Sequence, residues 1–485
     1  MTFGILDYGV YLPRRRLQRS AVFAANAWFA PSMKGLAKGE KAAASWDEDP
    51  ITMAVEAGRS CLGPRDRGEL DAVLLASTSL PFADRQNAGV VKEALNLPDT
   101  VQSMDVSGGL RAGVSTLLSA LLQPGRKSLC TAAEKRVTRP GSEGEMNYGD
   151  GAAAVLVGEG NPIATLKGHH SVTVDFVDHF RASSSETDYC WESRWVRDEG
   201  YAKVGAGAVV DALEALGING EAVNHLIVPV TMRGVAGLFA SKAGIPAEAV
   251  CDPHGADIGD TGSAHALVLL TATLEKAKAG EIIVLIGYGQ GVDVLVFEVT
   301  PAIQTVSRDR FSKSLAGGKA ETNYMRHLAF TGALSYEPGM RAEQDQKTAL
   351  TALYRNRKTV LGLVGGRCTK TGTIQFPRTD ISVSQNERAV GTQEDYPLAD
   401  VPARIMTFTA DSLTYSPDPP SRYGTVEFEG GGRMAAEFVD ADAEDIEVGR
   451  EMRMVFRVKA IDQQRDFKRY FWKAAPVPAE AVKEG

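Results

Sequence analysis

The order of apolar and polar segments repeats along the first 300 residues of the chain. Short, continuous apolar runs such as DAVLLAST and GAAAVLVGEG alternate with segments whose apolar residues have helical spacing. Runs of this kind are typical of strands in a sheet whose two faces are both covered by helices. Because the same order of elements occurs twice, we expect two related α/β halves, residues 1–165 and residues 166–300.

The pattern changes after residue 300. Residues 301–345 are polar and charged and include the breaker EPGM, which predicts a tail and a linker. Within residues 346–475, a helical segment and a turn-rich stretch precede several short runs in which apolar and polar residues alternate. Such runs, with a triple-glycine turn at residues 430–432, are typical of a small all-β barrel. The expected fold class is therefore α/β, a duplicated layered domain followed by a small barrel.

Length, charge and cysteine content narrow the function classes. A chain of 485 residues is too long for one ordinary core, which favours two or three domains. The net charge of −8 and the lack of clustered Lys and Arg argue against a nucleic-acid partner. No apolar run reaches membrane-spanning length, and the N-terminal apolar run precedes its arginines, which reverses a secretory signal. The five scattered cysteines lack CxxC pairing, so we expect free thiols and a cytoplasmic protein without a membrane partner.

Four stretches follow one another over residues 1–335: GVYLPRRRL, KGEKAAASWDEDPITMAVEAG, YGDGAAAVLVG and IGDTGSAHALVLLTATLEKAKAGEIIVLIGYGQG. In this order they resemble the HMG-CoA synthases of archaea and bacteria and, more distantly, the type III ketosynthases. The resemblance implies the five-layered (αβαβα) thiolase fold, usually a homodimer, with the active site between the two halves. It also implies an acyl-CoA, a coenzyme A thioester, as substrate and no covalently bound cofactor.

The C-terminal part, from GLVGGRCTKTGTIQFP onward, resembles the acyl-CoA-associated OB-fold family that often accompanies thiolase-like proteins. Members of that family commonly begin with a zinc ribbon of four cysteines. In this sequence only Cys368 remains, and Thr371 stands where a CxxC pair would place its second cysteine. A structural zinc site needs about four nitrogen or sulfur ligands. We therefore predict that this segment binds no metal. The degenerate zinc-ribbon knuckle at Cys368 is expected to be an ordinary turn before an OB-fold barrel.

The resemblance assigns four catalytic positions, and this sequence departs from the family at each of them. The cysteine nucleophile falls on Leu110, in DVSGGLRAG, and a leucine cannot form a thioester. The family glutamate falls on Thr78 and the family histidine on Pro229. The family asparagine, in a G-N-T turn, becomes Asp260 in IGDTGSA. Four changes together indicate that the standard covalent mechanism is absent.

Two functions fit these changes. In the first, the chain is an enzyme, a condensing acyltransferase or an aldolase-type lyase, that forms or cleaves a carbon–carbon bond of an acyl-CoA without an acyl-cysteine intermediate. Such an aldol or Claisen-type step needs a base and donors for the thioester enolate. Asp260 and His254 are the candidate catalytic residues, because the loop CDPHGADIGDTGSA faces the active site of the family.

In the second function, the chain is a non-catalytic scaffold subunit that binds a separate, catalytically complete thiolase-like partner, with the OB-fold bridging the two. The loss of every standard catalytic residue favours this alternative. The candidate residues also have structural interpretations. Asp260 would cap the helix that follows it, and His254 would be a turn residue hydrogen-bonded to the backbone.

Overall fold

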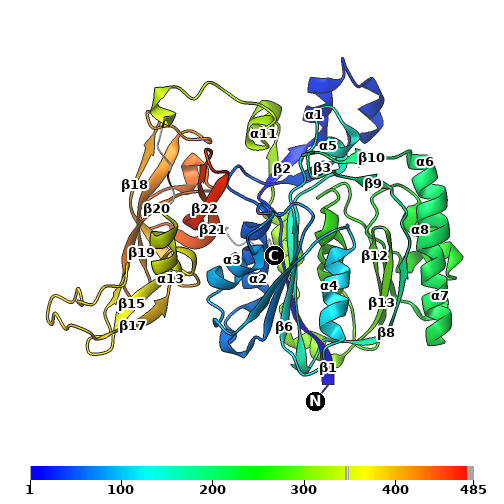
Figure 1. Ribbon diagram of the computed structural model, residues 1–485, viewed down its shortest axis with the longest axis horizontal. Helices are drawn as coiled ribbons and strands as arrows, with labels where there is room; N and C mark the ends of the chain where they lie inside the picture. Colours follow the sequence, from blue (N-terminus) through cyan, green and yellow to red (C-terminus); the bar gives the residue numbers. More distant parts are fainter. Residues whose placement is uncertain (1, 344–346, 348, 478–485) are drawn as a thin grey trace, which may run out of the picture. The chain divides into compact units, whose positions relative to one another are not determined.

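A computed structural model of the chain describes residues 2–343, 347 and 349–477, and it contains two units (Figure 1). No helix in this described part combines the length and the apolar character that a membrane crossing requires. Unit 1 comprises Met1–Ser45, Asp49–Lys92 and Leu97–Leu334, and unit 2 comprises Trp46–Glu48, Glu93–Asn96 and Ser335–Gly485.

Unit 1 is built on a nine-stranded sheet in which two groups of strands follow the same order. The first group is β5 (Gln102–Val106), β4 (Ala72–Ala76), β6 (Ser128–Glu134), β7 (Gly151–Gly160) and β1 (Thr2–Tyr11), and the second is β11 (His225–Ile227), β12 (Ile282–Tyr288), β13 (Gly291–Val299) and β8 (Ala164–Thr173). In the first group β5, β4 and β6 are parallel to one another, and β7 and β1 each pair antiparallel with the strand before them. In the second group β11 and β12 are parallel, and β13 and β8 each pair antiparallel with the strand before them. The groups join where Ile5 pairs with Ala164. At the far edge Leu226 pairs with Val250, in the place that β5 takes in the first group.

Helices cover both groups of strands and separate them, which gives five layers (Figure 1). The outer helices are α2 (Pro50–Leu62) on the first group and α7 (Ala206–Leu216) with α8 (Val235–Lys242) on the second, and the inner ones are α4 (Ala112–Leu121) and α9 (His265–Leu274). All ten residues of α9 are buried, as expected for a helix that is apolar on every side and lies in the core. α2 begins with a capping box, because Asp49 and Thr52 each accept from the other's backbone N–H.

Shorter elements complete unit 1. Residues 301–334, expected to form part of a polar tail, are folded within it. Strand β14 pairs in parallel with β2, and Arg310 of α10 forms an ion pair with the buried Asp7 of β1. The remaining elements are β2 (Arg15–Gln18), α1 (Arg19–Asn26), β3 (Glu40–Ala43), α3 (Asn87–Ala94), α5 (Glu143–Asn147), β9 (His179–Phe180), β10 (Tyr189–Cys190), α6 (Ser193–Trp195), a π-helix (Val196–Gly205), α10 (Arg310–Ala316), β14 (Lys319–Glu321) and α11 (Tyr324–Phe330).

Unit 2 carries two antiparallel sheets. The larger has the order β20 (Arg433–Glu437), β19 (Ser421–Phe428), β18 (Ala403–Asp411), β21 (Glu451–Asp462) and β22 (Phe467–Pro476), and the smaller has β16 (Ile374–Gln375), β15 (Val364–Cys368) and β17 (Gln393–Pro397), preceded by α12 (Leu350–Arg355) and α13 (Arg357–Leu361). Phe438, just after β20, forms a bridge with Ala474 of β22, which brings the two edges of the larger sheet together. Gly430, Gly431 and Gly432 all have positive φ in the β19–β20 turn, a conformation that favours glycine.

Candidate active site

The four positions assigned by the resemblance follow strands of unit 1. In open α/β sheets, ligands bind beyond the carboxyl ends of the strands. Thr78 follows β4, and Pro229 follows the equivalent strand β11 of the second group. Leu110 follows the edge strand β5, and Asp260 follows the short edge segment at Val250. The duplicated fold therefore places these positions in two equivalent pairs.

Asp260 forms an ion pair with Arg136, a buried residue that follows β6. Arg136 Nη2 lies 3.1 Å from Asp260 Oδ2 and also donates to the Asp260 carbonyl over 2.7 Å. Asp260 Oδ1 accepts from the Gly262 N–H at 2.8 Å, and Thr261, not Asp260, is the N-cap of the short helix that follows. The Asp260 side chain keeps an exposed fraction of 21%, whereas that of Arg136 is 1%. The carboxylate is thus held firmly but still reaches solvent.

The charge of Asp260 depends on this arginine. Burial alone would raise the pKa of the Asp260 carboxyl, but the Arg136 guanidinium and the Gly262 N–H favour the ionised form and hold that pKa below its usual range. Asp260 is therefore a carboxylate at neutral pH. It is a good hydrogen-bond acceptor and a weak base.

Tyr148 covers one face of the same arginine. The Arg136 guanidinium carbon lies 3.5 Å from the centre of the Tyr148 ring, a close cation–π contact. Burial raises the pKa of the Tyr148 phenol, so the hydroxyl stays neutral. That hydroxyl lies 3.5 Å from Cys190 Sγ. Arg136 therefore connects the Asp260 loop to β10 through Tyr148.

Glu134, the last residue of β6, connects the Thr78 segment to the Asp260 loop. Its carboxylate accepts from the Thr78 N–H at 3.1 Å and from the Ser77 hydroxyl at 3.2 Å. It also accepts from the Ser263 N–H at 3.2 Å and from the Ser263 hydroxyl at 2.7 Å. Because Glu134 is fully buried, these bonds offset the cost of removing a charge from water. The backbone at Thr78 is fixed whatever side chain it carries.

His254 lies in the same loop as Asp260 but has different partners. Its Nδ1 lies 3.0 Å from Asp257 Oδ2, and its ring packs against Phe311 with centroids 4.8 Å apart. Its backbone N–H donates to Asp252 at 2.8 Å, and its φ of 50° is left-handed, as in a turn. The structure brings Arg136, rather than His254, to Asp260. The catalytic roles assigned to both residues stay predictions.

Three residues of this loop are spaced as cation ligands are. One ligand atom from each of Asp252, His254 and Asp257 lies within 4.8 Å of the others. These groups are exposed or half-buried and already bond to one another. In unit 2, Cys368 lies at a tight turn, with its Sγ 3.2 Å from Thr392 Oγ1. That the chain holds no metal stays a prediction at both places.

The β9–β10 ladder lies beside these residues. Cys190 of β10 faces His179 of β9 directly across it. Arg181, just after β9, donates to the carbonyl of Thr78. Through Cys190 the ladder contacts Tyr148, and through Arg181 it contacts Thr78. The ladder thus carries a histidine and a cysteine to the neighbourhood of two of the matched positions.

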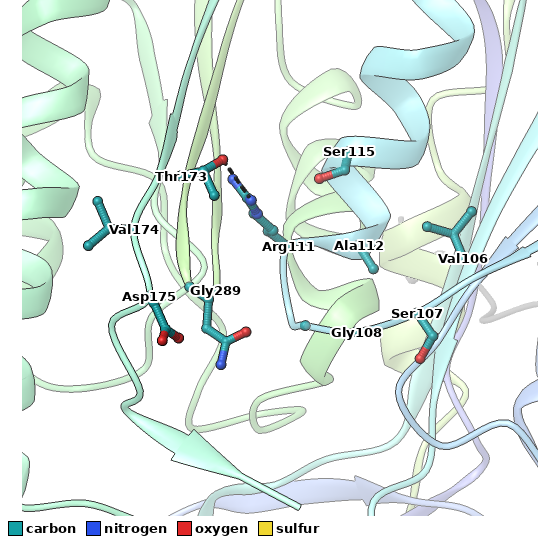
Figure 2. Close-up of a pocket in the computed structure, with 12 residues that line it drawn as sticks. Val106, Ser107, Gly108, Arg111, Ala112, Ser115, Thr173, Val174, Asp175 and Gly289 are labelled. Atoms are coloured by element: carbon teal, nitrogen blue, oxygen red, sulfur yellow. Dashed lines mark hydrogen bonds between the residues drawn. The ribbon is translucent and has the colours of Figure 1, made fainter.

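A cavity of about 360 Å³ opens beside the start of α4 (Figure 2). Its lining comes from the β5–α4 connection, the end of β8 and the β12–β13 turn. Figure 2 shows Arg111 extending from the start of α4 toward Thr173, whose hydroxyl lies 3.3 Å from Arg111 Nη2. The hydroxyls of Ser107 and Ser115 also belong to the lining. A cavity of this size, with a few polar groups in its lining, suits a small ligand or one part of a larger one.

The β12–β13 turn closely approaches the backbone at Leu110. A Cβ atom on Gly289, in the β12–β13 turn, would lie only 2.9 Å from the backbone nitrogens of Leu110 and Arg111, so the approach requires glycine. Backbone N–H groups at a helix start favour negative charge, including the charge that develops on a thioester oxygen. Leu110 therefore carries an apolar side chain at a point where two backbone segments lie close together.

These observations define the class of the two units. Unit 1 has the duplicated, layered α/β fold of thiolase-like proteins, and unit 2 carries an OB-fold domain. Residues 396–457 match the family model described as "ChsH2, C-terminal OB-fold domain". The predicted fold class, a layered thiolase fold followed by an OB-fold barrel, is confirmed.

The comparisons with known proteins are more specific. The chain is 27% identical over 326 residues to the hydroxymethylglutaryl-CoA synthase of Caldivirga maquilingensis, covering 65% of this chain and 92% of that protein. It is 28% identical over 339 residues to that of Archaeoglobus fulgidus, covering 67% and 97%. These relatives confirm the resemblance to HMG-CoA synthases.

Solved structures agree with the fold. "MvaS in complex with 3-hydroxy-3-methylglutaryl coenzyme A" matches with a TM-score of 0.59 and 18% identity, covering 70% of this chain and 95% of that one. The 3-oxoacyl-(acyl carrier protein) synthase III FabH from Pseudomonas aeruginosa matches with a TM-score of 0.55 and 20% identity, covering 62% and 99%. The likeness to ketosynthase III structures is thus confirmed at the level of the fold.

The sequence pointed to Asp260 but not to its surroundings. The sequence did not identify Glu134 and Arg136 as site residues. The charged residues EKR directly after the apolar run SLCTAA do indicate that charged side chains lie at the end of a buried strand. The stretch YGDGA around Tyr148 gives no sign of its contact with Arg136. Asp178 and His179 begin the segment DHFRASSSETDYCWESRWVRDEGY, which resembles a connection of the family but carries no catalytic motif.

Proposed function

We propose that unit 1 acts on an acyl-CoA thioester and forms or cleaves a carbon–carbon bond by an aldol or Claisen-type step without an acyl-cysteine intermediate. The similarity to HMG-CoA synthases, over 92% of the length of one relative, supports the CoA thioester as substrate. The observation that carries the proposal is Leu110 at the position of the family nucleophile, because leucine offers no atom that can be acylated.

Asp260 and His254 are the residues proposed to serve this chemistry. The Asp260 carboxylate, ionised beside Arg136 and 21% exposed, is suited to accept a hydrogen bond from a substrate hydroxyl. The His254 side chain keeps an exposed fraction of 12% in the same loop. The backbone N–H groups at the start of α4 are proposed to stabilise the thioester enolate.

A homodimer is the proposed assembly, in the cytoplasm. The edge strand β5 has no partner strand on its outer side within the described residues, and the Met104 side chain there is 41% exposed. An open edge with an apolar residue favours pairing with a second chain. The five cysteines, none of them in a disulfide, are in keeping with a reducing compartment.

The alternative is a scaffold subunit that binds a separate, catalytically complete thiolase-like partner through its OB-fold. The family match of residues 396–457, to the model described as "ChsH2, C-terminal OB-fold domain", supplies the OB-fold that such a scaffold would use. The change at all four matched positions favours it as well.

One purification separates the two functions. The isolated chain is offered a panel of 3-hydroxyacyl-CoA thioesters, and the release of acyl-CoA and a carbonyl product is followed by mass spectrometry. Turnover that Asp260→Asn with His254→Ala abolishes, and that the exposed control Asp211→Asn on α7 retains, supports the enzyme and rules out the scaffold. An inactive chain that co-purifies with a thiolase-like protein, in a complex whose activity survives both substitutions, refutes the enzyme.

A further inference from the structure

His179 and Asp178 form a hydrogen-bonded pair at the start of the β9–β10 ladder. Asp178 Oδ1 accepts from the His179 backbone N–H at 2.8 Å and lies 2.8 Å from His179 Nδ1. A carboxylate can only accept, so Nδ1 carries the proton and Nε2 presents its lone pair. Within the described residues Nε2 has no hydrogen-bond partner, and the side chain keeps an exposed fraction of 21%. The imidazole is therefore fixed in one tautomer with its basic nitrogen available.

The charges around His179 come from three neighbouring segments. Asp178 and Asp188 favour the imidazolium, and Arg136 disfavours it. Cys190 pairs with His179 across the ladder. Burial lowers the pKa of His179, but the bond from Asp178 outweighs it, so the pKa lies above its ordinary value. This histidine therefore takes up a proton more readily than an unperturbed imidazole.

The pair is linked to the candidate active site through the β9–β10 ladder. Arg136 is close enough to His179 to disfavour its imidazolium, and it pairs with Asp260. Cys190 lies opposite His179 and touches Tyr148, which packs on Arg136. Asp260 itself is held ionised and is a weak base. A histidine with a free ring nitrogen is a stronger base for the proton transfer of the proposed reaction, and His179 supplies one.

We propose that His179, oriented by Asp178, is the general base and acid of unit 1 and that the substrate is a 3-hydroxyacyl-CoA. The inference rests on the proposed function. In cleavage, Nε2 takes the proton of the 3-hydroxyl group while the bond between C2 and C3 breaks. The oxygen forms a carbonyl, and the electron pair of the broken bond becomes the thioester enolate. The imidazolium then returns its proton to C2, which gives an acyl-CoA and an aldehyde or ketone. Condensation is the reverse, and no oxidant or reductant takes part.

Substitution with chemical rescue tests the assignment. His179→Ala is expected to lower kcat about 100-fold or more, the usual contribution of a general base, and added imidazole is expected to restore part of the rate. Asp178→Asn is expected to move the acidic limb of the pH profile of kcat/KM to lower pH, because a bond that favours the imidazolium is lost. The matched control is His225→Gln on β11, where His225 Nε2 lies 2.8 Å from Glu281 outside the site. The control is expected to leave the rate and the profile unchanged.

A second readout separates the two hypotheses. Hydrogen exchange at C2 of acetyl-CoA in D₂O, followed by NMR, reports formation of the enolate alone. A wild-type chain that neither cleaves the panel nor exchanges this hydrogen overturns the proposed function, and the role of His179 with it. A wild-type chain that does either, with His179→Ala and Asp178→Asn matching its rate and pH profile, overturns the role of His179 alone. The melting temperature of each variant shows whether a lost rate reflects unfolding. If His179→Ala unfolds, the shift of the acidic limb of the kcat/KM profile in Asp178→Asn tests the role of His179.

Discussion

The ion pair between Arg136 and Asp260 is expected to be the main electrostatic support of the candidate site. Asp260→Asn leaves the Arg136 cation, 1% exposed, without the carboxylate that pairs with it directly, although Glu134 and Asp188 remain nearby. Removing one partner of a buried pair costs about 3–5 kcal/mol, and the lower end applies because Asp260 still reaches solvent. Arg136→Met should cost less, about 2 kcal/mol, since the carboxylate keeps its bond from the Gly262 N–H.

The double variant is the decisive measurement. If the two groups stabilise each other, Asp260→Asn with Arg136→Met should cost about 3 kcal/mol instead of the roughly 5 kcal/mol that independent effects would give. Thermal unfolding of unit 1 should show the largest fall in Tm, about 6 °C or more, for Asp260→Asn alone. Effects of the two single variants that add within about 0.5 kcal/mol would refute the coupling.

The coupling should also depend on pH in one direction. The pKa of Asp260 is lower in the folded chain than in the unfolded one, so its contribution is fully present above the unfolded pKa of about 3.9. It is lost as the pH falls through the folded pKa. The same double-mutant cycle should therefore give equal coupling at pH 7 and pH 5 and a smaller one near pH 3. A coupling that does not change over this range would mean that the carboxylate charge is not its source.

Three further expectations concern packing, the cysteine and acid stability. Gly149→Ala should lower the Tm of unit 1 by several degrees, because its Cβ would lie 1.9 Å from the carbonyl oxygen of Ile258, two residues before the candidate carboxylate; an unchanged Tm would contradict this. Incubation with acyl-CoA should leave no acyl group on Cys190, and an adduct at that residue in a peptide mass map would contradict the absence of an acyl-cysteine. Burial and neighbouring cations lower the pKa of His327 to about 2, so stability should fall as the pH drops below about 6.5, where the unfolded histidine takes up a proton. His327→Phe should weaken that dependence between pH 7 and 5 in unfolding experiments, and an unaltered slope would refute it.

The fold was largely predictable from the sequence because its signals are local. Apolar runs of strand length, repeated in one order, suffice to predict a duplicated α/β unit, and alternation with a glycine-rich turn suffices for the barrel. The fold of residues 301–334 was not predicted, because it depends on partners far away in sequence, such as Asp7 for Arg310. A polar segment whose charges are paired in the fold has the same composition as a solvated tail.

The site was predictable only in part for the same reason. Asp260 could be found because it falls in a recognisable turn, but its charge state depends on Arg136, which is 124 residues away. His179 acquires its surroundings from β-ladder pairing with Cys190, and pairing across a loop leaves no periodic trace in the sequence. His254 shares a loop with Asp260, but its side chain contacts Asp257 and Phe311, and neither contact leaves a signal in the sequence.

The carboxylate of Glu134 has a consequence for how this fold changes its chemistry. It holds the backbone at Thr78 through an amide N–H, and Gly289 approaches Leu110 at its backbone nitrogen, so neither support involves the side chain that a reaction would use. Shape and reactivity are encoded by different atoms. The side chains at these two positions can therefore be exchanged without a change in the backbone. The variants Thr78→Glu and Leu110→Cys should fold as readily as the wild-type chain.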